Sequence, residues 1–315
     1  MDKLVILTGP TAVGKTSLSI NLAKAIGGEI ISADSMQVYT GMDIGTAKIK
    51  KEEMDGVVHH LIDIIEPTEE FHVVRFQQLV KDAIAEIYKK GKIPIICGGT
   101  GFYIQAILYD IQFTEEEIDK EYRNQLEEYA KTNGIEALHE RLKDVDPESA
   151  ESIPAANVKR VVRALEYFKQ TGEKFSVHNA KERERKSPYN FAYFVLNDDR
   201  ALLYNRIDKR VDIMMEEGLL DEVKKLISLG CKRGMTSMDG IGYKEMLSYL
   251  DGDYSLEEAV ELIKKNSRNY AKRQLTWFRR EKEVIWLDKT IYKSEEDLLN
   301  TMIIALKEKG IIESV

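Results

Sequence analysis

Residues 9–16 read Gly9-Pro10-Thr11-Ala12-Val13-Gly14-Lys15-Thr16, a glycine and four free positions followed by Gly-Lys-Thr. This is the pattern of a phosphate-binding loop, in which glycines let the backbone curl until successive N–H groups point at phosphate oxygens. In such a loop Lys15 reaches the terminal phosphates, and the Thr16 hydroxyl ligates Mg²⁺. An apolar run at 4–7 precedes the loop and a helical pattern at 15–26 follows it, as the motif requires. We therefore predict a site for a phosphate compound and Mg²⁺.

Outward from this loop, apolar runs and helical patterns alternate through the first hundred residues, which is typical of a parallel α/β sheet. Residues 114–190 are instead charged and mainly helical, and a strand at 191–196 returns to the core. We predict an α/β fold, a P-loop NTPase-like parallel sheet core of residues 1–113 and 191–315 with a mainly helical insertion domain at 114–190. Further expected elements are strands at 29–32, 93–97 and 284–287, an apolar run at 60–65, a helix at 74–89, helices up to 280 and a last helix.

The bulk composition is that of an ordinary globular protein, with 43% apolar and 32% charged residues and a net charge of −8. No apolar run approaches the roughly 18 residues of a membrane span. Cys97 and Cys231 are too few for a disulfide framework, and their contexts differ too much for a metal site. Cys97 lies in an apolar run and is expected to be a small buried thiol. We expect a cytoplasmic protein with no membrane association.

Asp34 follows the expected strand at 29–32, which we expect to neighbour the strand of the phosphate loop. The carboxyl ends of parallel strands line the binding site of such folds. Two active roles are open for Asp34, a carboxylate of the Mg²⁺ shell or a general base. The structural alternative is an aspartate that caps a helix or forms a turn.

Basic residues gather in two places although the net charge is negative. Lys265, Arg268, Lys272 and Arg279 fall at helical spacing, with aromatic residues near the end of that stretch, and a second group lies at 159–163. Such a combination suits phosphate tracking and base stacking on single-stranded RNA. The alternative is a solvated basic helix whose aromatic residues belong to the core.

Several motifs occur in order from the first strand to the last quarter of the chain. They are the loop 9–16, Ser32-Ala33-Asp34-Ser35-Met36-Gln37-Val38-Tyr39, Gly41-Met42-Asp43-Ile44-Gly45-Thr46-Ala47-Lys48, His59-His60-Leu61-Ile62-Asp63, Gly98-Gly99-Thr100-Gly101-Phe102-Tyr103, Arg160-Val161-Val162-Arg163-Ala164-Leu165-Glu166, Gly240-Ile241-Gly242-Tyr243-Lys244-Glu245 and Ala271-Lys272-Arg273-Gln274-Leu275-Thr276-Trp277-Phe278-Arg279. Together they resemble those of the tRNA dimethylallyltransferases, also called tRNA isopentenyltransferases.

The resemblance implies transfer of the dimethylallyl group from dimethylallyl diphosphate to N6 of the adenosine at tRNA position 37, 3′ of the anticodon, with release of diphosphate. The loop 9–16 would then hold the prenyl diphosphate, with Mg²⁺ on Thr16, and no ATP need be consumed. The expected partners are the tRNA anticodon stem-loop and dimethylallyl diphosphate, and the expected oligomeric state is a monomer.

Family motifs also imply residue roles. Asp34 would be the general base, Arg210 the catalytic arginine, and Thr100 a residue that touches the diphosphate or the target nucleotide. Without the resemblance, Arg210 could be a solvated helix arginine paired with Asp199 or Asp212, and Thr100 a helix N-cap. The implied tRNA contacts are Asp34, Ser35, Met36, Gln37, Arg123, Lys159, Arg160, Val161, Val162, Arg163, Asp239, Gly240, Ile241, Gly242, Tyr243, Lys244, Lys272, Arg273, Gln274, Leu275, Thr276, Trp277, Phe278 and Arg279.

The chain also departs from the family pattern. Ile49-Lys50 stands where proline is usual, and residues 153–157 replace a stretch containing His-Pro-Asn, leaving Asn157 as a helix N-cap. His59-His60 suggests a metal pair, but neighbours on a strand point to opposite faces, so structural roles are favoured. Three other functions stay open: prenylation of free adenine nucleotides, a P-loop kinase for a small metabolite, and non-catalytic RNA binding.

Overall fold

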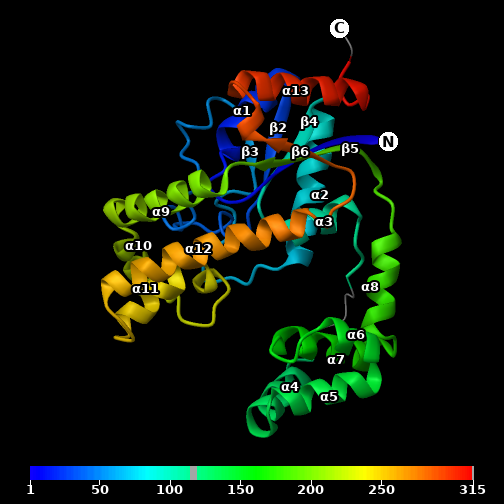
Figure 1. Cartoon of the computed structure of the whole chain (residues 1–315), viewed down its shortest axis with the longest axis vertical. Helices are drawn as coiled ribbons and strands as arrows, with labels where there is room; N and C mark the ends of the chain where they lie inside the picture. The colour runs from blue at the N-terminus through cyan, green and yellow to red at the C-terminus, as the bar shows by residue number, and fades with distance from the viewer. Residues whose placement is uncertain (114–118, 314–315) are drawn as a thin grey trace. The chain divides into compact units, whose positions relative to one another are not determined.

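The computed structural model describes residues 1–113 and 119–313 (Figure 1). The chain divides into two compact units, one of Met1–Leu108 with Pro188–Val315 and one of Tyr109–Ser187. These limits lie within a few residues of the expected ones, and the expected start of the insertion at 114 falls outside the described residues.

The first unit is built on a sheet of six strands in the order β3-β2-β4-β1-β5-β6, all in parallel pairs. Because every strand runs the same way, all carboxyl ends meet at one edge of the sheet. The predicted α/β class is confirmed. The strands are β1 (Asp2–Thr8), β2 (Gly28–Ala33), β3 (His59–His60), β4 (Ile93–Gly98), β5 (Tyr189–Asn197) and β6 (Val284–Asp288).

One expectation about the sheet is wrong. The strand before Asp34, β2, does not neighbour β1, because β4 pairs with both of them and lies between. The apolar run of β4 explains this position, since a strand buried on both faces belongs in the middle of a parallel sheet. Gly98 is in register with Thr8 on one side and Ala33 on the other, so the ends of the three strands are level.

Helices of the first unit cover both faces of this sheet. Predicted helices at 15–26 and 74–89 match α1 and α2, and α2 starts one residue early because the His72 side chain accepts from the Arg75 N–H. The helices are α1 (Lys15–Ile26), α2 (Val73–Lys89), α3 (Gly101–Leu108), α9 (Arg200–Glu217), α10 (Leu219–Ser228), α11 (Tyr243–Leu250), α12 (Leu256–Phe278) and α13 (Glu295–Glu308), with short 3₁₀ turns η1 (Ser237–Asp239) and η2 (Lys289–Ile291).

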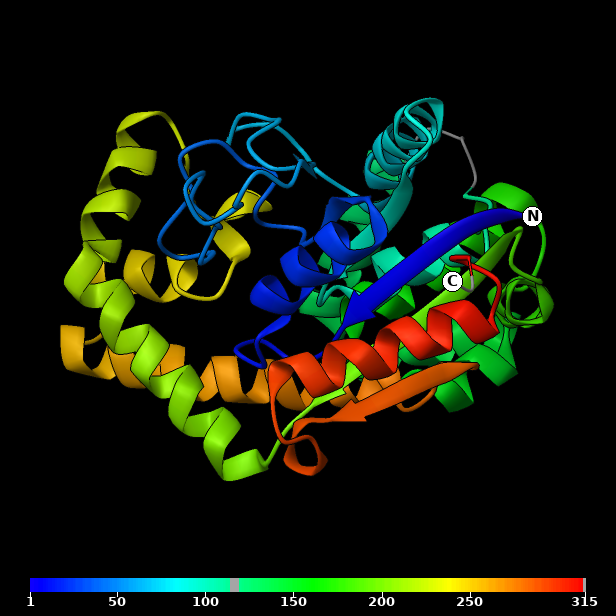
Figure 2. The same ribbon diagram turned by 90° about the horizontal axis from the view of Figure 1, so that it is seen from above.

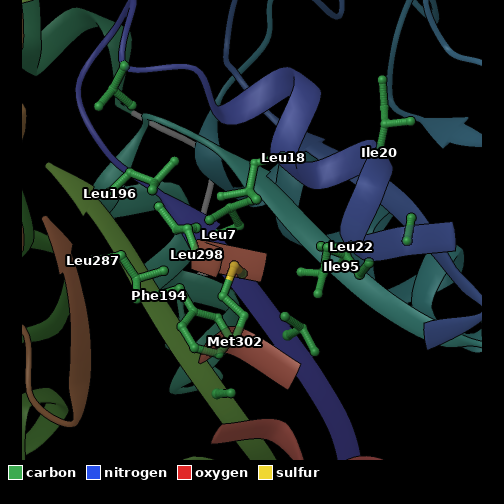
Figure 3. Packing of buried hydrophobic residues seen from close by; sticks show 14 of the residues in the cluster. Leu7, Leu18, Ile20, Leu22, Ile95, Phe194, Leu196, Leu287, Leu298 and Met302 are labelled. Atoms are coloured by element: carbon green, nitrogen blue, oxygen red, sulfur yellow. The ribbon is translucent and has the colours of Figure 1, made fainter. Parts of the chain in front are cut away.

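The core on one face of the sheet joins α1 and α13 to the strands (Figure 3). Leu7 of β1 packs in one cluster with Leu18 and Leu22 of α1 and with Leu298 and Met302 of α13. Figure 2 shows α13 running alongside β6 at this face. The C-terminal segment therefore supports the strand and helix that flank the phosphate loop.

The second unit is mainly helical, as predicted, with its own core of apolar side chains such as Leu138, Leu142 and Val161. Asn157 caps α7 as expected, since its side chain accepts from the Arg160 N–H at 3.4 Å. Its helices are α4 (Lys120–Asn133), α5 (Ile135–Val145), α6 (Pro147–Ser152), α7 (Val158–Thr171) and α8 (Phe175–Glu184). Across both units, none of the helices described has the length and apolar character needed to cross a membrane.

Candidate active site

The phosphate loop connects β1 to α1 at the carboxyl edge of the sheet. Gly14 is the N-cap of α1 and has a φ of +97°, in the left-handed region where a side chain would be strained. No side chain among the described residues caps α1, and its first turn carries no acid. The free N–H groups and the helix dipole therefore favour an anion at this position.

Lys15 begins α1 and folds back over the loop, where its Nζ donates to the carbonyls of Gly9 at 3.0 Å and Pro10 at 2.8 Å. Burial is the main cause that lowers its pKa to about 8, and nearby Arg210 lowers it further, against the raising effect of Cys97 and Asp34. No carboxylate in the described part of the chain forms an ion pair with Lys15. A bound diphosphate would supply the missing negative charge.

Asp34 follows directly after β2 and is half-buried. Its Oδ1 accepts from the Met36 N–H at 2.9 Å, so the turn predicted as an alternative is present. Burial raises the pKa of the carboxyl, and the Met36 N–H and the Lys15 charge only partly oppose this. A carboxylate with a raised pKa is a better proton acceptor, so the turn and the general-base role are compatible.

Arg210 lies on α9, close enough to Lys15 to affect its pKa. Its side chain is solvent-exposed, yet the protein around the guanidinium lowers its pKa through partial burial. Asp199 instead caps α9 by accepting from the first N–H groups of that helix, and Asp212 pairs with Lys264 at 2.8 Å. The two aspartates that the alternative interpretation paired with Arg210 thus bind other groups, and Arg210 remains available to an anion.

Gln274 of α12 joins the phosphate loop to the loop after β4. Its buried side chain accepts from the Thr11 N–H at 2.9 Å and donates to the Gly99 carbonyl at 3.0 Å. Sequence motifs implied a tRNA contact for Gln274, but both ends of its amide are engaged inside the protein. The structure therefore places the Gln274 side chain in an internal bridge, and its contact with tRNA stays a prediction.

Thr100 lies between these loops and α3. Its carbonyl accepts from the N–H of Ile104 at 3.2 Å in the first turn of α3, and its side chain hydrogen-bonds the Tyr270 hydroxyl. Burial raises the pKa of Tyr270 to about 12, and the charge of Asp34 adds to this effect. Thr100 therefore lies at the start of a helix, as the alternative predicted, and its contact Tyr270 is close to Asp34.

The family model of the IPP transferases matches residues 37–281. The chain belongs to the IPP transferase family. It is 59% identical over 313 residues, 99% of this chain and all of the relative, to a tRNA dimethylallyltransferase of Lachnoclostridium phytofermentans.

Two solved structures are similar along nearly the whole chain. One is the full-length tRNA isopentenylpyrophosphate transferase of Bacillus halodurans, 48% identical with a TM-score of 0.73, with 98% of each chain covered. The other is a eukaryotic dimethylallyltransferase acting on tRNA, 30% identical with a TM-score of 0.82, covering 99% of this chain and 80% of that one.

The loop 41–48 of this IPP transferase family member is held by a residue that sequence motifs did not single out. Glu222 accepts from the N–H groups of Asp43 and Ile44, each at 2.8 Å, and of Gly45 at 3.0 Å, and from the Tyr243 hydroxyl at 2.7 Å. Tyr243 was expected to contact tRNA, but it is 1% exposed. Its hydroxyl instead completes the cluster that fixes this loop.

The segment 239–244, which contains Tyr243, lies against the active site at Gly240. A Cβ at Gly240 would meet the Met36 Cε at 2.7 Å, so the segment packs directly against the turn after Asp34. Ser35, Met36 and Gln37 are half-buried in that turn, and Gln37 donates to the Thr46 carbonyl at 3.3 Å. In the segment 239–244, the side chains exposed to solvent are those of Asp239 and Lys244.

At the C-terminal end of α12 and just past it, Lys272, Arg273, Arg279 and Arg280 are exposed and form a basic surface. Phe278 is buried, whereas Trp277 is half-buried against Gly101, where a Cβ would lie 2.3 Å from its ring. An open pocket of about 330 Å³ is lined by Asn269, Lys272, Arg273, Thr276, Trp277 and Arg280. Leu275 is half-buried, and Arg279 is exposed nearby.

In the helical unit, the residues expected to contact tRNA differ in exposure. Val161 and Val162 are in the core, which excludes their side chains from contact with a ligand at the surface. Arg123 forms a two-pronged ion pair with buried Glu166, at 2.8 and 2.7 Å. Lys159 and Arg160 are exposed and Arg163 is half-exposed, so the basic part of the motif stays available.

His59, His60 and Cys97 each contact different groups of the protein. His60 pairs with Glu29 at 2.8 Å, and His59 contacts the Val57 carbonyl at 2.9 Å. Cys97 is only half-buried and lies near Lys15, although burial still raises its pKa. Its position beside the phosphate loop is an unexpected feature of the site.

The residues at the loop fit a magnesium ion that arrives with a diphosphate. The Thr16 side chain is exposed at the start of α1, where its hydroxyl can act as one oxygen ligand. In the described ranges there is no group of three or more histidine, cysteine or acidic side chains that could hold a metal. Mg²⁺ commonly takes one or two protein oxygens and completes its shell with phosphate oxygens and water, which matches this sparse donor set.

Proposed function

We propose that this chain transfers the dimethylallyl group of dimethylallyl diphosphate to N6 of the adenosine at tRNA position 37, 3′ of the anticodon, and releases diphosphate. The observation that carries the proposal is that Asp34 and Arg210 both lie close enough to Lys15, at the carboxyl edge of the sheet, to affect its pKa. An anion site and a proton acceptor thus share one place. The named activity of the 59% identical relative supports the same reaction.

The proposed chemistry is a single displacement. The N6 nitrogen forms a bond to C1 of the dimethylallyl group, the bond from C1 to the diphosphate oxygen breaks, and the N6 proton passes to Asp34. An aromatic amine is a poor nucleophile, so a carboxylate of raised pKa in contact with it assists the attack. Lys15 and Arg210 stabilise the charge that grows on the leaving diphosphate. Mg²⁺ held by Thr16 would supply further positive charge there.

The substrate RNA must present its adenine outside the stack, because N6 lies on a base edge that a stacked loop does not expose. We propose that the exposed basic side chains of α12, together with exposed Lys159 and Arg160 and half-exposed Arg163, bind the anticodon stem-loop by its phosphates. The enzyme would act as a monomer in the cytoplasm, without membrane association.

The test is incubation with labelled dimethylallyl diphosphate and Mg²⁺, together with either unmodified tRNA or AMP. We expect label in tRNA, at position 37, and none in a tRNA whose position 37 is guanosine. Label in AMP would instead favour the adenine-nucleotide prenyltransferases. Hydrolysis of ATP without any transfer of label would favour a P-loop kinase.

A further inference from the structure

Lys289 brings a second ammonium group to the phosphate loop from the far end of the chain. It is the first residue of η2, directly after β6, and its half-buried side chain donates to the Val13 carbonyl at 3.2 Å. A Cβ at Gly14 would lie 3.1 Å from the Lys289 Nζ. Lys289 lies beyond the region 37–281 that the family model matches.

The chemistry of this contact bears on anion binding. The Val13 carbonyl and the Gly14 N–H belong to the same peptide group, and Gly14 is the N-cap of α1. A cation at the carbonyl polarises the peptide and makes its N–H a stronger donor. In a phosphate loop that N–H is among the groups that point at the anion.

The segment that carries Lys289 is held at both ends. Before the turn, Asp288 is paired with Asn197 of β5, and its Oδ1 accepts within the turn from the Thr290 N–H at 3.0 Å and from the Thr290 hydroxyl at 2.8 Å. After the turn, Glu295 of α13 accepts from Asn21 of α1 at 2.8 Å. Figure 2 shows β6 leading through this turn into α13. The Lys289 ammonium is therefore supported at its place rather than carried on a loose terminus.

In the part of the chain that the structure describes, the charge of Lys289 is not neutralised by a partner. Among the described residues no carboxylate forms an ion pair with it, whereas Arg268 of α12 pairs with Asp208 of α9. Two amines, Lys15 inside the loop and Lys289 behind it, thus lie at the start of α1, and no acid of the described residues contacts either of them. This charge balance suits a ligand with more than one negative charge.

We propose that Lys289 is a positioning residue of the diphosphate site. It holds and polarises the Val13–Gly14 peptide, and it adds positive charge beside the bound diphosphate. The identity of the prenyl donor rests on the proposed function, but the role itself requires only a diphosphate anion.

The test measures binding of inorganic pyrophosphate with Mg²⁺ by calorimetry in wild type, Lys289→Gln and Lys289→Arg. We expect Lys289→Gln to weaken binding about fivefold, which is the order expected of one partly exposed charge near a helix N-terminus. Lys289→Arg should retain most of the affinity. The control is Lys293→Gln, which removes an exposed lysine four residues further on and should change nothing.

A kinetic readout separates positioning from general stability. In Lys289→Gln the KM for dimethylallyl diphosphate should rise by the same factor, while the KM for tRNA and the unfolding temperature stay at wild-type values. Wild-type pyrophosphate affinity in Lys289→Gln would overturn the proposal, as would equal losses in the Gln and Arg variants with a lowered unfolding temperature. If pyrophosphate binding depends on Lys289 but no dimethylallyl transfer to tRNA occurs, the proposed function fails and this role stands.

Discussion

Two carboxylates at opposite ends of β2 have opposite electrostatic surroundings. Glu29, near the start of the strand, accepts from Lys92 and Lys90, each at 2.9 Å, and from His60 at 2.8 Å. Burial alone would raise its pKa, but these hydrogen bonds outweigh it and lower the pKa to about 2. Asp34, just past the end, accepts from backbone N–H groups of the following turn and from no cationic side chain among the described residues, and burial raises its pKa.

The difference distinguishes a structural charge from a functional one. Glu29 is 1% exposed and has a cationic partner at each of its two carboxylate oxygens, so the protein itself stabilises the charged form. Asp34 has the Lys15 charge nearby but no ion pair with any described residue, so its proton affinity is left for a substrate to use. The same contrast runs along α12, where Lys264 is paired with Asp212 and Lys272 is unpaired in the described part of the chain.

Replacing the functional carboxylate should have the largest effect. In Asp34→Asn the rate of transfer should fall by about 10²–10⁴, the usual contribution of a general base. Pyrophosphate binding should stay within about twofold, because the base acts on the amine. Single-turnover rates and calorimetry on the same preparation measure both quantities, and a parallel loss of binding would contradict the assigned role.

Replacing the structural carboxylate should affect stability instead. Glu29→Gln should lower the free energy of unfolding by about 2 kcal/mol, the order of a buried hydrogen-bonded charge, and leave the transfer rate unchanged. Denaturant titration measures the loss, with exposed Glu52→Gln as control. Because the folded protein lowers the pKa of Glu29, the charged carboxylate contributes its full stabilisation above the ordinary pKa of 4.5. This stabilisation is lost as the pH falls toward about 2, so the difference in unfolding free energy between wild type and Glu29→Gln should shrink over that window.

The pH dependence of kcat/KM should report the ionisation of both Asp34 and Lys15. This rate constant should rise with pH as Asp34 loses its proton, and the midpoint of the rise should lie above 3.8, the ordinary pKa of an aspartate carboxyl. Above about pH 8 it should fall, approaching about tenfold per pH unit, because Lys15 becomes neutral and no longer attracts the diphosphate. Lys15→Arg should remove the alkaline limb, since a guanidinium stays charged. An unchanged limb in that variant would assign it to another group.

The smallest effects are expected on α12. Lys272→Ala and Arg279→Ala should each weaken tRNA binding about threefold at moderate salt and reduce the salt slope by about one charge. Filter binding at several salt concentrations measures this. Lys264→Ala is the matched control, because its partner Asp212 should make it a change in stability and not in slope. Salt slopes equal to that of wild type in all three variants would favour a solvated helix without RNA contacts.

Local patterns carried most of the fold prediction. The phosphate loop, α1 and the strand before Asp34 follow from glycine placement and apolar runs, which act within a few residues of one another. The position of β4 between β1 and β2 does not follow, because strand order depends on which apolar faces meet. Exposure along α12 and α7 was only partly predictable, since motif residues such as Gln274 and Val161 turn inward.

The sequence by itself determined that this chain has a phosphate loop, a carboxylate after the next strand and a basic C-terminal helix, because each is written in a short segment. Only the tertiary structure decided which distant side chains complete the site. Gln274 reaches Thr11 across 263 residues, and Lys289 reaches Val13 across 276. No local pattern predicts such pairs, because they exist only once the parallel strands bring their carboxyl ends to one edge of the sheet.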